Sequence, residues 1–125
     1  MIKKEQEKLP SNEDVERFEM LRPILVSMLF EIKEFSKKKQ DMQLNELKIK
    51  KINQILSKIK NILSHEPTIE FLDLLDEDTL PTNSDAVLIL DQYVRCMKLF
   101  EDKYYGWDGE VNRWRTKENP VKFFD

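Results

Sequence analysis

The stretch SNEDVERFEMLRPILVSMLFEIKEF, residues 11–35, decides the fold. Ser11 is followed three residues later by Asp14, a spacing typical of a helix N-terminus. From there apolar residues recur at steps of three and four, which is one face of an α-helix. The members of this face are Phe18, Leu21, Leu25, Met28, Ile32 and Phe35. Pro23 lies inside the pattern and predicts a kink near Arg22, because proline removes a backbone donor and clashes with the preceding turn.

A second helix is predicted from about Asp41 to Ser64, after a polar connection at residues 36–40. Its apolar stripe is wider than a two-position seam, so we expect this helix to contact two neighbours. The stripe consists of Ile49, Ile52, Leu56, Ile59 and Leu63, flanked by Leu44, Leu47, Ile55 and Ile62.

Two further helices follow in the prediction. Pro67 has a fixed φ that suits the first helical position, so a short acidic helix is expected over residues 67–78. Thr82 and Asp85 repeat the helix-start spacing, and a long helix is expected from about Ser84 to Tyr105. A short amphipathic piece is expected over residues 110–117.

These elements predict an all-α fold, a four-helix bundle-like domain with an aromatic C-terminal tail. Two long antiparallel helices come first, followed by a short acidic helix and a fourth long helix. Residues 1–10 are expected to be a polar lead-in. Residues 11–125 are expected to form a single helical domain that includes the aromatic tail at residues 106–125.

Composition supports one helical domain and excludes several classes of function. The 125 residues are 40% hydrophobic and 36% charged, which is typical of a folded helical protein. Only two glycines occur, Gly106 and Gly109, so a glycine-rich phosphate loop is excluded from the first 105 residues. Cys96 is the only cysteine, and the first ten residues are charged. We therefore expect a cytoplasmic protein without a membrane segment.

Charge is distributed unevenly along the chain. Residues 31–65 hold nine basic and four acidic residues, whereas residues 66–91 hold eight acidic and no basic residues. Two such segments can neutralise each other in a packed pair or present two poles to partners, and the sequence does not decide between these outcomes.

The C-terminal tail is the first candidate binding surface. Seven of the twelve aromatic residues lie in the last 26 positions. Trp107 and Trp114 alternate there with Arg113 and Arg115, a combination enriched at interface hot spots. The tail can fold back onto its own bundle or dock on a second copy to form a homodimer, and the sequence leaves both arrangements open.

An acidic group is the second candidate surface, formed by Glu70, Asp73, Asp76 and Glu77. Carboxylates on one short helix can bind a basic or nucleic-acid-binding target. This is how acidic helical inhibitors and immunity-type proteins work. The six residues 110–115 resemble the ending of the nuclease-colicin immunity proteins, but the order of the upstream elements differs and the chain is not assigned to that family.

A carboxylate-metal dependent all-α hydrolase is a further alternative. The pairs Glu16/Glu19, Glu31/Glu34 and Glu70/Asp73 have the i, i+3 spacing of helical metal sites. All-α nucleotide pyrophosphohydrolases bind magnesium through comparable pairs. A zinc site is not expected, since His65 and Cys96 are single and 31 positions apart.

Nucleic acid is not the expected partner. Eight lysines make the second helix and its preceding loop basic, but the chain as a whole is acidic. These residues are Lys37, Lys38, Lys39, Lys48, Lys50, Lys51, Lys58 and Lys60. The sequence thus favours a non-enzymatic, self-associating protein–protein interaction or adaptor protein with no cofactor, metal site or catalytic residues.

Overall fold

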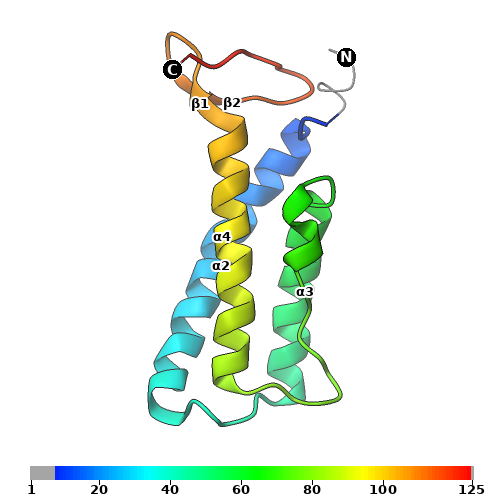
Figure 1. Ribbon diagram of the computed structural model, residues 1–125, viewed down its shortest axis with the longest axis vertical. Coiled ribbons are helices and arrows are strands. Elements are labelled where there is room, and N and C mark those ends of the chain that lie inside the picture. Colours follow the sequence, from blue (N-terminus) through cyan, green and yellow to red (C-terminus); the bar gives the residue numbers. More distant parts are fainter. Residues whose placement is uncertain (1–7, 125) are drawn as a thin grey trace.

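The computed structural model describes residues 8–124, which form three α-helices, a short 3₁₀ helix and one β-hairpin (Figure 1). The α-helices are α2 (Asn12–Lys39), α3 (Glu46–Ile62) and α4 (Asn83–Tyr104). The 3₁₀ helix η1 spans Pro67–Phe71, and the strands are β1 (Tyr105–Trp107) and β2 (Asn112–Trp114). The predicted all-α class broadly fits. The predicted four-helix bundle does not, because these residues supply only three long helices.

Both predicted helix-start patterns are present as capping boxes. The Ser11 hydroxyl accepts a hydrogen bond from the Asp14 N–H at 3.0 Å, and the Asp14 carboxylate accepts one from the Ser11 N–H at 3.1 Å. Thr82 and Asp85 cap α4 in the same way. Pro23 does not break α2, which runs unbroken from Asn12 to Lys39. None of the described helices has the length and apolar character that crossing a bilayer requires.

The second helix begins later than predicted. Asn45 caps α3 by accepting a hydrogen bond from the Lys48 N–H at 2.9 Å, so the helix starts at Glu46 rather than at Asp41. The residues before it pair with the segment that enters α4. Leu44 N–H donates to the Pro81 carbonyl and Asn83 N–H donates to the Met42 carbonyl, both at 2.9 Å. This pairing closes one end of the molecule.

The predicted acidic helix over residues 67–78 is wrong. η1 ends at Phe71, and the chain then returns without helical structure toward the start of α4 (Figure 1). α3 and α4 therefore run parallel to each other and antiparallel to α2. Asn53 holds the returning segment, because its side chain accepts from the Leu75 N–H and donates to the Leu75 carbonyl, both at 2.8 Å. The Tyr93 hydroxyl donates to the Asp73 carbonyl at 2.8 Å.

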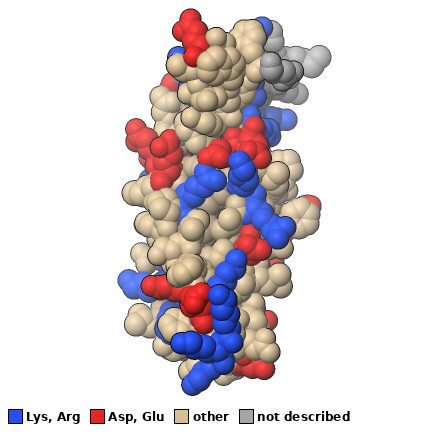
Figure 2. Space-filling view, turned by 90° about the vertical axis from the view of Figure 1, so that its left-hand side faces the viewer, with Lys and Arg blue, Asp and Glu red and all other residues tan. Residues whose placement is uncertain are grey.

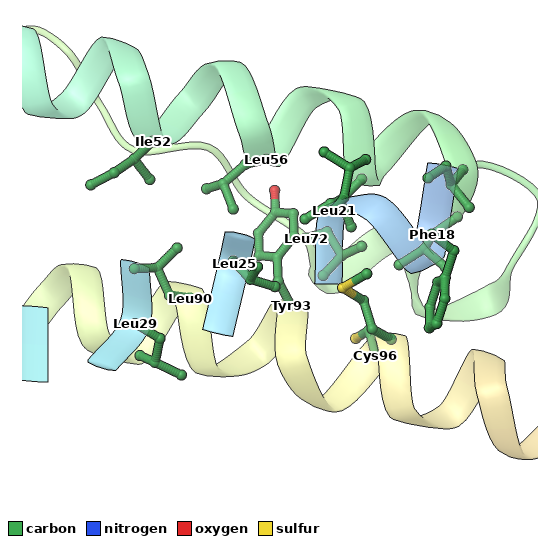
Figure 3. Packing of buried hydrophobic residues seen from close by; sticks show 14 of the residues in the cluster. Phe18, Leu21, Leu25, Leu29, Ile52, Leu56, Leu72, Leu90, Tyr93 and Cys96 are labelled. Atoms are coloured by element: carbon green, nitrogen blue, oxygen red, sulfur yellow. The ribbon is translucent and has the colours of Figure 1, made fainter. Parts of the chain in front are cut away.

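A single apolar core lies between the three helices and the returning segment. Leu25 of α2, Leu56 of α3 and Leu90 of α4 are completely buried and face one another (Figure 3). Tyr93 extends from α4 toward α3 between them, with Leu72 beside it. Burial raises the pKa of the Tyr93 hydroxyl far above its ordinary value, with the Asp73 carboxylate adding to the rise.

One carboxylate is buried at the other end of α3. Glu66 accepts a hydrogen bond from the Tyr104 hydroxyl at 2.8 Å and forms an ion pair with Lys103 at 3.4 Å. Burial, together with the Glu66 carboxylate, raises the pKa of Tyr104. Both partners come from the last turn of α4, so this contact fixes η1 against that helix.

The C-terminal region forms a β-hairpin, not the predicted amphipathic piece. Tyr105 pairs with Trp114, and Gly109, with a φ of +105°, makes the turn. The chain then returns to the start of α2, where the Thr116 hydroxyl donates to the Asn12 side-chain carbonyl at 2.7 Å. Lys117 N–H donates to the Pro10 carbonyl at 2.9 Å. Leu9 and Pro10 are buried, whereas residues 1–7 of the predicted polar lead-in lie outside the described residues.

Candidate protein-binding groove

The structure docks the tail in cis. The Trp114 ring lies 5.4 Å from the Phe18 ring of α2 and 6.0 Å from the Phe100 ring of α4, measured between ring centroids. It also lies 5.3 Å from the Tyr105 ring. Trp114 is therefore half-buried against helices of its own chain in this structure.

The other predicted tail residues divide into engaged and exposed side chains. The Arg113 guanidinium pairs with the Asp108 carboxylate at 2.5 Å, and Arg115 lies over the Phe123 ring at 5.1 Å. Trp107 is 46% exposed. Two neighbours at the hairpin end, Val111 and Phe124, are also exposed. Trp107 is thus the predicted tail residue that is most available to a partner.

The predicted acidic group is exposed but does not lie on one helix. Glu70 lies in η1, and Asp73, Asp76 and Glu77 lie on the returning segment, so the four carboxylates share no helix face. Within residues 8–124, no ion pair closer than 4 Å joins the basic segment 31–65 to the acidic segment 66–91. The two poles therefore do not neutralise each other through close contacts.

Figure 2 shows one side of the molecule, with acidic and basic side chains interleaved along it. Its upper end, at the hairpin, is covered mainly by uncharged side chains, and basic side chains gather at the lower end, where α2 ends. Among the ion pairs of the molecule, Arg22 of α2 pairs with Glu101 of α4, and Lys98 pairs with the same carboxylate at 3.3 Å. This side therefore offers no large surface of one sign.

An apolar groove of about 520 Å³ lies between α2 and α3. The apolar side chains that line it are Met28, Ile32 and Phe35 of α2, Leu44 of the connection, and Leu47, Ile52 and Ile55 of α3. Phe35 is 52% exposed and Leu47 is 67% exposed. α2 packs more extensively on α4 than on α3, and the two groove helices diverge toward the lower end of the molecule (Figure 1). We call this feature the α2–α3 groove.

The rim of the α2–α3 groove is mainly basic. Lys48, Lys51 and Lys58 border it on α3, and Glu31 borders it on α2. None of the four forms an ion pair within 4 Å with a described residue. The Lys48 ammonium lies 4.9 Å from the centre of the Phe35 ring, which places a positive charge directly on the apolar lining.

The groove was not among the predicted sites, although the sequence carries a signal for it. The apolar stripe of the second helix is wide enough to contact two neighbours. In the structure, the part of this stripe that contains Leu47 and Ile55 faces the groove. Phe35 was predicted to lie on the core face of the first helix, but it is exposed at the groove edge.

The remaining chemical candidates do not come together. Glu16, Glu19, Glu31 and Glu34 are exposed on α2. Among residues 8–124, no three histidine, cysteine or acidic side chains are grouped to hold a metal ion. Cys96 is buried, which raises the pKa of its thiol, whereas His65 is exposed.

Comparisons of this chain with protein-family models, curated proteins and solved structures find no match. The geometry of the molecule therefore supplies its candidate sites, the α2–α3 groove and the tail.

Proposed function

We propose that this chain is a non-enzymatic protein–protein interaction module that binds through the α2–α3 groove. The observation that carries the proposal is the exposure of Phe35 and Leu47 at 52% and 67%, on either side of a continuous apolar lining. A groove between two helices can receive the apolar face of a third helix. Burying such side chains removes apolar area from water, which is the main source of binding free energy at helix interfaces.

A photo-crosslinking amino acid at position 47 tests this proposal in cells that naturally make the chain. Position 88 on α4 is the matched control, because Leu88 is 63% exposed and does not line the groove. We expect a crosslinked protein product of defined mass from position 47 and none from position 88. Equal products from both positions, or no product from position 47, would contradict binding at the groove.

Self-association through the hairpin end is the second candidate. Trp107, Val111 and Phe124 are exposed there, and aromatic side chains are enriched at interfaces. Sedimentation equilibrium of the wild type and of Trp107→Ala separates the candidates. A dimer that Trp107→Ala dissociates would support this route, and a monomeric wild type at micromolar concentration would exclude it.

A further inference from the structure

We infer that the occupant of the α2–α3 groove is an acidic amphipathic helix of a partner protein. This inference rests on the proposed function and adds the chemistry of the partner. Two helices line the groove, and side chains of a third helix can pack into the space between them. The mainly basic rim favours acidic side chains on that helix.

The positions of the rim lysines define the occupant. Lys48, Lys51 and Lys58 border the groove from α3, and Lys48 and Lys58 are ten positions apart, which is about 15 Å at the helical rise. A partner helix of three turns or more can place Asp or Glu along that edge at steps of three and four. Its opposite edge meets Glu31, where a Lys or Arg is the complementary residue.

A second copy fits the groove less well than an acidic helix does. Three lysines and one glutamate border the groove, so two copies that met through it would bring six positive and two negative charges together, and the excess of like charges repels. The chain's own acidic group cannot supply the occupant from another copy in helical form, because Asp73, Asp76 and Glu77 lie on a segment without helical structure.

Two synthetic peptides test the inference against the whole chain by fluorescence anisotropy. Both are amphipathic helices of about 18 residues, long enough to be partly helical in water. They share one leucine face and a lysine on the edge that meets Glu31, and the other edge carries glutamates in one peptide and lysines in the other. At about 50 mM salt we expect the acidic peptide to bind about ten-fold more tightly or better, because three exposed pairs replace three repulsions.

Matched variants locate the binding. Leu47→Lys should weaken binding of the acidic peptide about five-fold or more, because the apolar contact that it removes outweighs the attraction of the added positive charge, and Leu88→Lys should not weaken it. The double variant Lys51→Glu/Lys58→Glu should reverse the order of the two peptides. The control Lys117→Glu/Lys122→Glu changes the net charge equally but lies in the tail, so it should preserve the order.

The outcomes separate this inference from the proposed function. Equal affinities for the two peptides, both weakened by Leu47→Lys, would overturn the acidic partner and leave the groove as a binding surface. Binding that Leu47→Lys does not change would overturn both. A dimer of the chain that Leu47→Lys dissociates would show that a second copy fills the groove, which also overturns the inference.

Discussion

Replacing Asn53 by alanine is expected to lower the free energy of unfolding by about 2–4 kcal/mol. The Asn53 side chain is 9% exposed and makes two hydrogen bonds of 2.8 Å to the N–H and carbonyl of Leu75. Alanine leaves both backbone groups without that partner, and Leu75 itself is only 3% exposed. Each buried polar group that loses its partner costs about 1–3 kcal/mol, and partial access of water to the segment reduces the total.

Urea unfolding followed by circular dichroism measures this loss, with Asn61→Ala as the matched control. Asn61 is exposed near the end of the same helix, so its replacement should change the free energy of unfolding by about 0.5 kcal/mol or less. If Asn53→Ala and Asn61→Ala agree within about 0.5 kcal/mol, these bonds do not hold the returning segment.

A third variant, Asn53→Asp, separates the two hydrogen bonds. It keeps the acceptor for the Leu75 N–H but sets a carboxylate against the Leu75 carbonyl, which should raise the pKa of the new carboxyl. Its protonated form can donate to that carbonyl. At neutral pH, Asn53→Asp should therefore have a lower free energy of unfolding than Asn53→Ala, and this difference should shrink on acidification. A difference that does not change with pH would refute the contact between this side chain and the Leu75 carbonyl.

Three further predictions concern the tail and the charged side of the molecule. Trp114→Ala should lower the free energy of unfolding by about 2–3 kcal/mol, because the Trp114 ring packs on Phe18 and Phe100. Trp107→Ala should lower it by about 1 kcal/mol or less, because Trp107 is exposed. Equal losses in urea unfolding would contradict the packing of Trp114 on its own chain. Burial opposes the charge of Glu101, but Arg22 and Lys98 outweigh it and hold the pKa of that carboxyl below its ordinary value. The ionised Glu101 carboxylate therefore stabilises the fold above its ordinary pKa, and this stabilisation is lost as the pH falls and the carboxylate is protonated. Glu101→Gln should reduce the fall in the free energy of unfolding between about pH 5 and pH 3. A fall equal to that of the wild type would contradict this role of Glu101. Gly109→Ala should lower the free energy of unfolding by about 1–2 kcal/mol in thermal unfolding, because alanine is strained at a φ of +105° and its Cβ would lie 3.2 Å from the Phe124 ring. A free energy of unfolding equal to that of the wild type would contradict this turn geometry.

The long helices could be predicted because their signals are local. The capping boxes at Ser11 and Thr82 each depend on residues three positions apart, and the apolar faces of α2 and α4 repeat over many turns. The segment over residues 67–78 could not be predicted in this way. Leu72 and Leu75 have a spacing that suits a helix, but the backbone of Leu75 is bound by a side chain 22 positions earlier. No local pattern contains that information.

The candidate groove was indicated by the sequence only in part. The width of the stripe on the second helix showed that more than one neighbour was required, but periodicity does not say which arc of a helix is covered within the molecule. The exposure of Leu47 depends on where α2 diverges from α3, and that follows from the packing of α2 on α4. The tail was recognised as a candidate by its aromatic residues, and its docking in cis depends on Phe18, 96 positions before Trp114.

The contact between Phe18 and Trp114 has a consequence for synthesis on the ribosome. α2 emerges early, and the two rings that pack on Phe18, those of Phe100 and Trp114, are both in place only once position 114 has followed. At about 5–20 residues per second, that interval lasts roughly 5–20 s. During this time the core face of α2 is available to chaperones, to other nascent chains and to proteases. The rate of translation through α4 and the hairpin therefore sets how long this protein is vulnerable before it folds.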